Sequence, residues 1–170
     1  MPSTRIRVRS RCREIRRWPY FAGYAMWTYL TTPFTLTRPG FRAEELEPWQ
    51  EDGETWRRLR VEFPDDLTTH NKVQTFYFDA DGLIRRHDYD AEVVAGGLAA
   101  HYSSAHCAVD GIVVPTKRRV HPVGEDGKPV LEPLLVSIDL SEIEFGEITF
   151  AWGTATGRAG AAAVIPRSPR

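Results

Sequence analysis

Five histidines are the side chains best suited to move protons near neutral pH, and three of them lie within one predicted hairpin. A two-residue turn at Gly96-Gly97 would place His87 opposite His106, with Tyr89 and Tyr102 on the same face. Imidazoles can act as general acid and base, and a phenol can orient a substrate oxygen. The catalytic candidates are therefore His87, His106, Tyr89 and Tyr102.

The same hairpin also has a structural interpretation. Histidines on adjacent strands commonly serve as hydrogen-bonded groups at the rim of a sheet, and a slip of one residue would mix the two faces. In the register set by the Gly96-Gly97 turn, the opposite face holds Glu92 and His101 as an exposed cross-strand pair. A third convergent ligand is not evident, so the sequence predicts neither a metal site nor a cofactor.

The strands that would position these residues are marked by four Asp-Gly dipeptides, at 52–53, 81–82, 110–111 and 126–127. Asp-Gly between alternating apolar runs is a strong hairpin signal, because glycine accepts the positive φ of a tight turn. We expect six or seven strands in an antiparallel meander. The strand candidates are residues 58–63, 73–78, 83–94, 99–107, 112–121 and 130–140.

Paired arginines follow three of these turns, at 57–58, 85–86 and 118–119. Alternate strands of a meander run in the same direction, so the pairs could align as a stripe that meets an anionic group. They could equally form a solvated face that the many acidic side chains balance.

A buried helix is predicted over residues 20–30, where apolar side chains follow Pro19 nearly all round and the pattern ends before Pro33. The acidic stretch 39–49 is expected to be a connector. Residues 18–150 would form a single β-rich domain, with a flexible Arg-rich arm at 1–17 and a disordered tail at 151–170. The predicted fold class is mainly β with a helix (α+β), as an antiparallel meander forming a curved sheet or an incomplete β-barrel closed by the helix.

The overall charge of −1 conceals an uneven distribution. Residues 1–17 carry seven arginines and one glutamate, whereas residues 18–150 carry 12 basic and 22 acidic side chains. An acidic body argues against specific nucleic-acid binding. The uncharged run 18–37 is too polar for a membrane span and lacks a signal cleavage site, so the sequence indicates a cytoplasmic protein.

One part of the chain resembles a known family. The run Phe76-Tyr77-Phe78-Asp79-Ala80-Asp81-Gly82-Leu83-Ile84-Arg85-Arg86, followed by Val109-Asp110-Gly111-Ile112-Val113-Val114-Pro115-Thr116, resembles the sheet of the lipoprotein-carrier (LolA-like, LppX-like) superfamily and of uncharacterised actinobacterial proteins. Members fold as an incomplete β-barrel whose concave face, closed by helices, holds acyl chains or other apolar ligands. The resemblance implies that the helix at 20–30 closes the concave face and that the chain is a member truncated at its N-terminus.

Three functions fit these observations. The first is a domain that binds an apolar or amphipathic small molecule or an acyl chain in the concave face of a half-barrel. The second is a small-molecule cyclase, isomerase or dehydratase that uses the histidine and tyrosine cluster, and the third is an interaction domain. For the first function, the expected ligand-binding residues are Phe76, Phe78, Tyr24, Trp27 and Arg85.

Overall fold

The computed structural model describes residues 17–91 and 97–146. The helices are α1 (Arg17–Thr31) and the short 3₁₀ helix η1 (Phe34–Thr37). The strands are β1 (Arg42–Glu51), β2 (Glu54–Glu62), β3 (Val73–Phe78), β4 (Ile84–Asp90), β5 (Leu98–Val109), β6 (Ile112–Pro122) and β7 (Val136–Asp139). The predicted arm, apart from its last residue, and the predicted tail lie outside the described residues.

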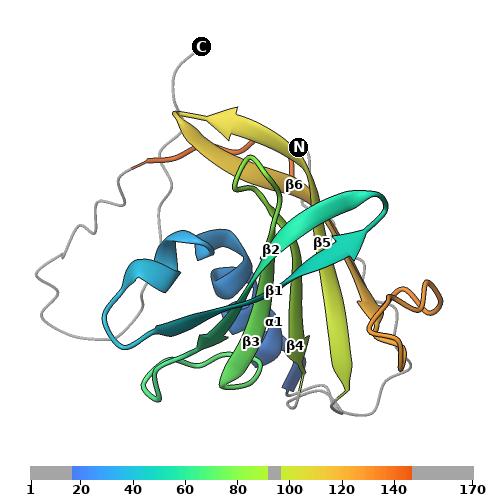
Figure 1. Cartoon of the computed structure of the whole chain (residues 1–170). Helices are drawn as coiled ribbons and strands as arrows, with labels where there is room; N and C mark the ends of the chain where they lie inside the picture. Colours follow the sequence, from blue (N-terminus) through green and yellow to red (C-terminus); the bar gives the residue numbers. More distant parts are fainter. Residues whose placement is uncertain (1–16, 92–96, 147–170) are drawn as a thin grey trace, which may run out of the picture.

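These seven strands form one antiparallel sheet whose order follows the sequence from β1 to β7. Figure 1 shows the sheet as a strongly twisted, curved layer. Two Asp-Gly dipeptides make the predicted two-residue turns: Asp52 and Gly53 have φ of 51° and 80°, and Asp110 and Gly111 have φ of 49° and 81°. Such left-handed turns match the twist of the flanking strands. The prediction of a mainly β antiparallel meander with one helix is confirmed.

The connection between β4 and β5 is longer than predicted. β4 ends at Asp90 and β5 begins at Leu98, so residues 91–97 join them instead of a two-residue turn. The Asp90 carboxylate accepts a 2.8 Å hydrogen bond from the backbone N–H of Gly97, which anchors the end of this connection. The predicted turn at Gly96-Gly97 is therefore wrong, although Gly96 itself lies outside the described residues.

This longer connection shifts the register by an odd number of residues. His87 pairs with His101 instead of His106, and Tyr102 pairs with Arg86. Since successive residues of a strand face opposite sides, Tyr102 lies on the other side of the sheet from His87. The predicted face with two histidines and two tyrosines is not formed.

The predicted connector at 39–49 is also wrong, because most of it belongs to the edge strand β1. Charged pairs join β1 to β2: Arg57 Nε donates to Glu45 at 2.8 Å, and Arg60 lies 3.8 Å from Glu44. Most of the β1 side chains are exposed. An exposed edge strand lacks the alternation of apolar and polar residues that marks a half-buried strand. The acidic sequence of β1 therefore has the composition of a loop.

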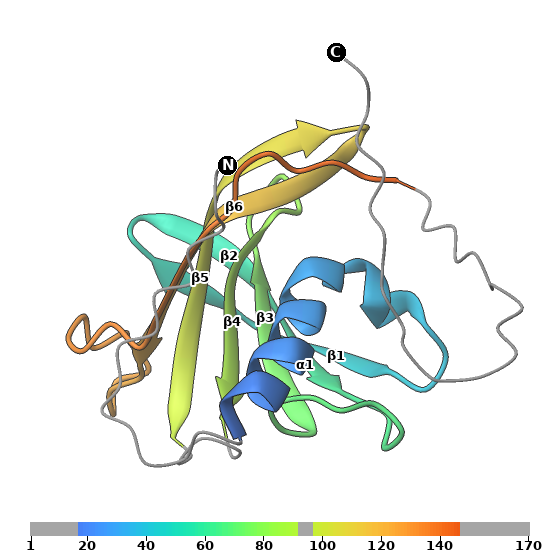
Figure 2. The ribbon, with the colours of Figure 1, turned by 180° about the vertical axis from the view of Figure 1, so that it is seen from behind.

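The helix α1 packs across one face of the sheet, termed here the inner face; Figure 2 shows it in front of β3 and β4. Phe21, Tyr24 and Tyr29 of α1 are buried there. They pack against Tyr89, Ala99, Val120 and Ile138. A second core cluster consists of Val61, Phe63, Phe76 and Ile84. The predicted helix at 20–30 is confirmed within α1, but it is buried on one side only, because Tyr20 and Leu30 are exposed. Its buried aromatic residues supply much of the core.

Two glycines test this description of the backbone. Gly111 has φ of 81°, a conformation that strains any Cβ, so Gly111→Ala is expected to lower the free energy of unfolding by about 1–2 kcal/mol. Gly23 is exposed within α1, and no described atom lies within 4 Å of where its Cβ would be. Gly23→Ala is therefore expected to raise the free energy of unfolding by about 0.5–1 kcal/mol. Urea titration measures both changes, and shifts in the same direction would contradict the assignment.

Candidate functional site

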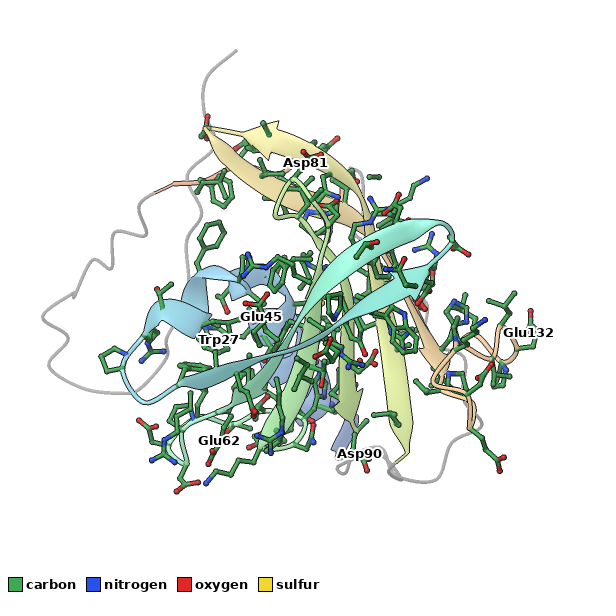
Figure 3. All side chains as sticks on the ribbon, in the orientation of Figure 1. Trp27, Glu45, Glu62, Asp81, Asp90 and Glu132 are labelled. Atoms are coloured by element: carbon green, nitrogen blue, oxygen red, sulfur yellow. The ribbon has the colours of Figure 1, made fainter. Side chains whose placement is uncertain are left out.

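An open cavity of about 710 Å³ lies between the C-terminal half of α1, η1, the start of β6 and the segment after β7. Trp27, labelled in Figure 3, and Leu30 line it from α1. Phe34 lines it from η1, Val113 from β6 and Phe145 from the segment after β7. These five side chains are between 37% and 56% exposed. Isolated exposed apolar residues are ordinary, but a group that shares one concave surface makes this cavity a candidate binding site.

A buried arginine lines the same cavity. Only 3% of Arg118 is exposed. Its Nη2 donates a 2.5 Å hydrogen bond to the carbonyl oxygen of Tyr29, and its Nη1 donates to Ser103 Oγ at 3.2 Å and lies 3.5 Å from His101 Nε2. Burial lowers the pKa of Arg118 to about 10, which leaves the guanidinium charged at neutral pH.

A layer of tyrosines and histidines fills the space between α1 and the inner face. The hydroxyls of Tyr29 and Tyr89 share a 2.6 Å hydrogen bond. His70, from the connection between β2 and β3, stacks on Tyr89 with ring centres 3.8 Å apart. His87 Nε2 donates a 2.6 Å hydrogen bond to Gln74 Oε1. These rings contact one another closely and form part of the core.

The histidines of this layer are held neutral. Burial lowers the pKa of His70 from 6.5 to about 3, and burial lowers those of His87 and His101 well below their ordinary range. Both ring nitrogens of His70 lack a hydrogen-bond partner among the described residues. None of the three histidines lines the 710 Å³ cavity.

The opposite, outer face carries a separate buried network around Arg86. Its Nε and Nη2 donate to the two oxygens of Asp88 at 2.7 and 2.9 Å, and its Nη1 donates to Glu51 at 2.9 Å. Tyr77 and Tyr102 donate to the same carboxylates, at 2.8 and 2.5 Å. Burial opposes the charge of Arg86, but the hydrogen bonds and charge of Asp88 outweigh burial and raise its pKa. Every charge in this network has a partner, as a buried ion pair requires.

Of the predicted ligand-binding residues, only Trp27 lines the large cavity. Tyr24 and Phe76 are buried in the two core clusters. Phe78 lines a separate hollow of about 260 Å³. The guanidinium of Arg85 lies 5.9 Å from the ring centre of Trp56. Two of the four predicted aromatic residues, Tyr24 and Phe76, thus pack against other side chains instead of lining a cavity.

The four catalytic candidates are not brought together. His87 and Tyr89 share the inner face, where their ring centres are 4.8 Å apart. Tyr102 belongs to the network on the outer face, and His106 Nε2 donates to the carbonyl oxygen of Ile84 at 3.1 Å. Among residues 17–91 and 97–146, no three metal-ligating side chains converge.

Leu30, Phe34, Val113 and Arg118 also line the cavity but were not among the predicted ligand-binding residues. Two signals pointed towards the cavity. The uncharged aromatic run 18–37 supplies Leu30 and Phe34, and the arginine pair 118–119 supplies the cation. The sequence alone did not show that these segments meet.

No protein-family model and no curated protein matches the chain. Among solved structures, it is similar to a LolA superfamily protein from Nitrosomonas europaea, with 13% identity and a TM-score of 0.49 over 65% of this chain and 47% of that protein. The chain thus spans about half the length of that protein. At this identity and TM-score, the resemblance to the lipoprotein-carrier superfamily stays a prediction. No helix in the described part of the chain is long and apolar enough to span a membrane.

The neutral histidines predict how stability depends on pH. Because the folded pKa of His70 lies below its unfolded value of 6.5, the unfolded chain binds more protons in acid, and stability falls as pH drops below about 6.5. His70→Phe is expected to reduce this slope by about 1.4 kcal/mol per pH unit. Tyr24→Phe, a neighbouring change that removes no group titrating in this range, should keep the wild-type slope. Urea titrations between pH 7 and 4.5 measure the slopes, and equal slopes in all three proteins would refute this description of His70.

Proposed function

We propose that this chain is a binding domain for an apolar or amphipathic small molecule, held in the cavity between α1, η1 and β6. The observation that carries the proposal is the open 710 Å³ cavity with its exposed apolar side chains. Ligand sites of proteins typically have volumes of about 300–1,000 Å³, mostly apolar walls and a few polar groups. This cavity meets all three criteria.

Burial of apolar surface would drive binding. A ligand that covers Leu30, Phe34 and Val113 removes their apolar surface from water, at about 25 cal/mol per Å². Two of the walls come from α1 and β6, which the core holds in place, so little ordering of these walls would accompany binding. The cavity also lies on the α1 side of the sheet, where the family resemblance places its ligand.

The enzymatic alternative stays a hypothesis. None of its four residues lines the cavity, and the two that share a face, His87 and Tyr89, are buried within the core. A general acid or base must reach its substrate within hydrogen-bond distance. Catalysis by His87 and Tyr89 would require these buried side chains to move, whereas binding in the cavity requires no such movement.

Uptake of the neutral fluorescent probe N-phenylnaphthylamine tests the binding function. Leu30 is half exposed, so Leu30→Gln should fold normally and weaken probe binding about tenfold, because it replaces apolar wall by a group that keeps its water. Leu131→Gln is the matched control: Leu131 is 68% exposed in the connection between β6 and β7, outside the cavity lining. A wild-type protein that takes up no probe at micromolar concentration, or an equal loss in both variants, would refute the proposal.

A further inference from the structure

Arg118 is a buried cation in the wall of a cavity whose exposed surface is mostly apolar. The side chain is 3% exposed and belongs to β6, the strand that also carries the cavity residues Val113 and Val114. The hydrogen-bonding atoms around it are all neutral: the carbonyl oxygen of Tyr29, Ser103 Oγ and His101 Nε2. Within the described part of the chain, its Nε has no hydrogen-bond partner and the guanidinium has no carboxylate within ion-pair distance.

Arg86 provides an internal comparison, because it is equally buried on the other face of the same sheet. Its guanidinium lies 2.7 Å from Asp88 and 2.9 Å from Glu51. Buried charges in proteins are normally paired in this way, since an unpaired ion loses its hydration without compensation. Arg86 also lines a hollow, of about 290 Å³, but with its carboxylates in place, whereas Arg118 lines the 710 Å³ cavity with no carboxylate partner in the described part of the chain.

Three other charged side chains line the cavity. They are Arg38, Glu142 and Glu144, and all three are exposed. Exposed charges keep their hydration and are screened by salt, so they act weakly on a bound group. The neighbouring histidine, His101, is neutral because of its burial. Arg118 is therefore the charge that a group entering the cavity would meet without intervening water.

We infer that the cavity binds an amphiphile with a single anionic head group, a carboxylate or a phosphate, which pairs with Arg118 while its apolar body lies along Trp27, Leu30 and Val113. This inference rests on the proposed function. A guanidinium with a free N–H suits either oxyanion, since it donates in a planar fork. The competing interpretation is structural: Arg118 would serve only to hold the Tyr29 carbonyl near the C-terminal end of α1.

Displacement of bound N-phenylnaphthylamine at pH 8 separates the two interpretations. Three ligands with the same chain are compared: dodecanoate, dodecyl phosphate and neutral dodecanol. The inference predicts that the wild-type protein binds at least one anion about ten- to hundredfold more tightly than dodecanol. The tighter anion identifies the head group. Equal affinity for all three would overturn the inference and leave the proposed function standing, whereas absence of probe uptake would overturn the proposed function itself.

Two variants assign this preference to one side chain. Arg118→Met keeps the length of the side chain without its charge, and it should bring anion affinity down to that of dodecanol. Dodecanol binding should stay within about threefold of wild type, because the Tyr29–Tyr89 hydrogen bond still holds α1 against the sheet. Lys117→Met removes an exposed cation next to it on β6 and should change none of the three affinities. An anion preference that survives Arg118→Met would overturn the assignment. The wild-type comparison needs no variant, so the inference stays testable if Arg118→Met folds poorly.

Discussion

Tyr29 connects the helix to the sheet, and the position of the cavity depends on that connection. Its hydroxyl shares a 2.6 Å hydrogen bond with that of Tyr89, and its carbonyl oxygen accepts one from Arg118 at 2.5 Å. Its ring and that of His101 are nearly perpendicular, with centres 4.2 Å apart. Polar contacts of this kind fix orientation more tightly than apolar packing alone. The last turn of α1 is thereby set against β4, β5 and β6, and Leu30 and the following η1 are placed over the start of β6.

The sheet separates two buried arginines with different surroundings. On the outer face, Arg86 has two carboxylates, two tyrosines and the carbonyl oxygen of Gly127 around it, and this network joins β1 and the connection after β6 to the centre of the sheet. On the inner face, Arg118 has neutral partners and an open cavity. The buried charge on the outer face is paired with carboxylates, whereas the inner face offers a buried charge with no carboxylate partner among the described residues, next to an apolar surface. This asymmetry is the physical basis of the proposed binding function.

Local signals in the sequence predicted the architecture well. Asp52-Gly53 and Asp110-Gly111 identified two hairpins, because a tight turn requires positive φ at residues that the local sequence supplies. The apolar run after Pro19 identified α1. The register of β4 and β5 could not be predicted, since it depends on a connection that Asp90 closes without a diagnostic turn. A shift of five residues was enough to separate Tyr102 from His87 and to bring His101 opposite His87.

The cavity was beyond prediction for a different reason. Its walls come from η1, β6 and residues after β7, which only tertiary packing brings together, and whether an aromatic ring lines a hollow or fills a core depends on its neighbours in space. Phe76 and Phe34 illustrate the difference, because the first is fully buried and the second is 56% exposed. The arginine pair at 118–119 carried the useful hint of an anionic partner, but without the fold it did not distinguish Arg118 from Arg86.

The most direct test of the central claim follows the tryptophan indole N–H signals of ¹⁵N-labelled protein by NMR during titration with dodecanoate. Trp27 lines the cavity, whereas the indoles of Trp49 and Trp56 each donate a 2.7 Å hydrogen bond to a glutamate away from it. Binding in the cavity predicts that the Trp27 signal shifts in a saturable way while those of Trp49 and Trp56 stay in place. A saturable shift of Trp49 or Trp56 without one of Trp27, or no saturable shift at all, would contradict the account.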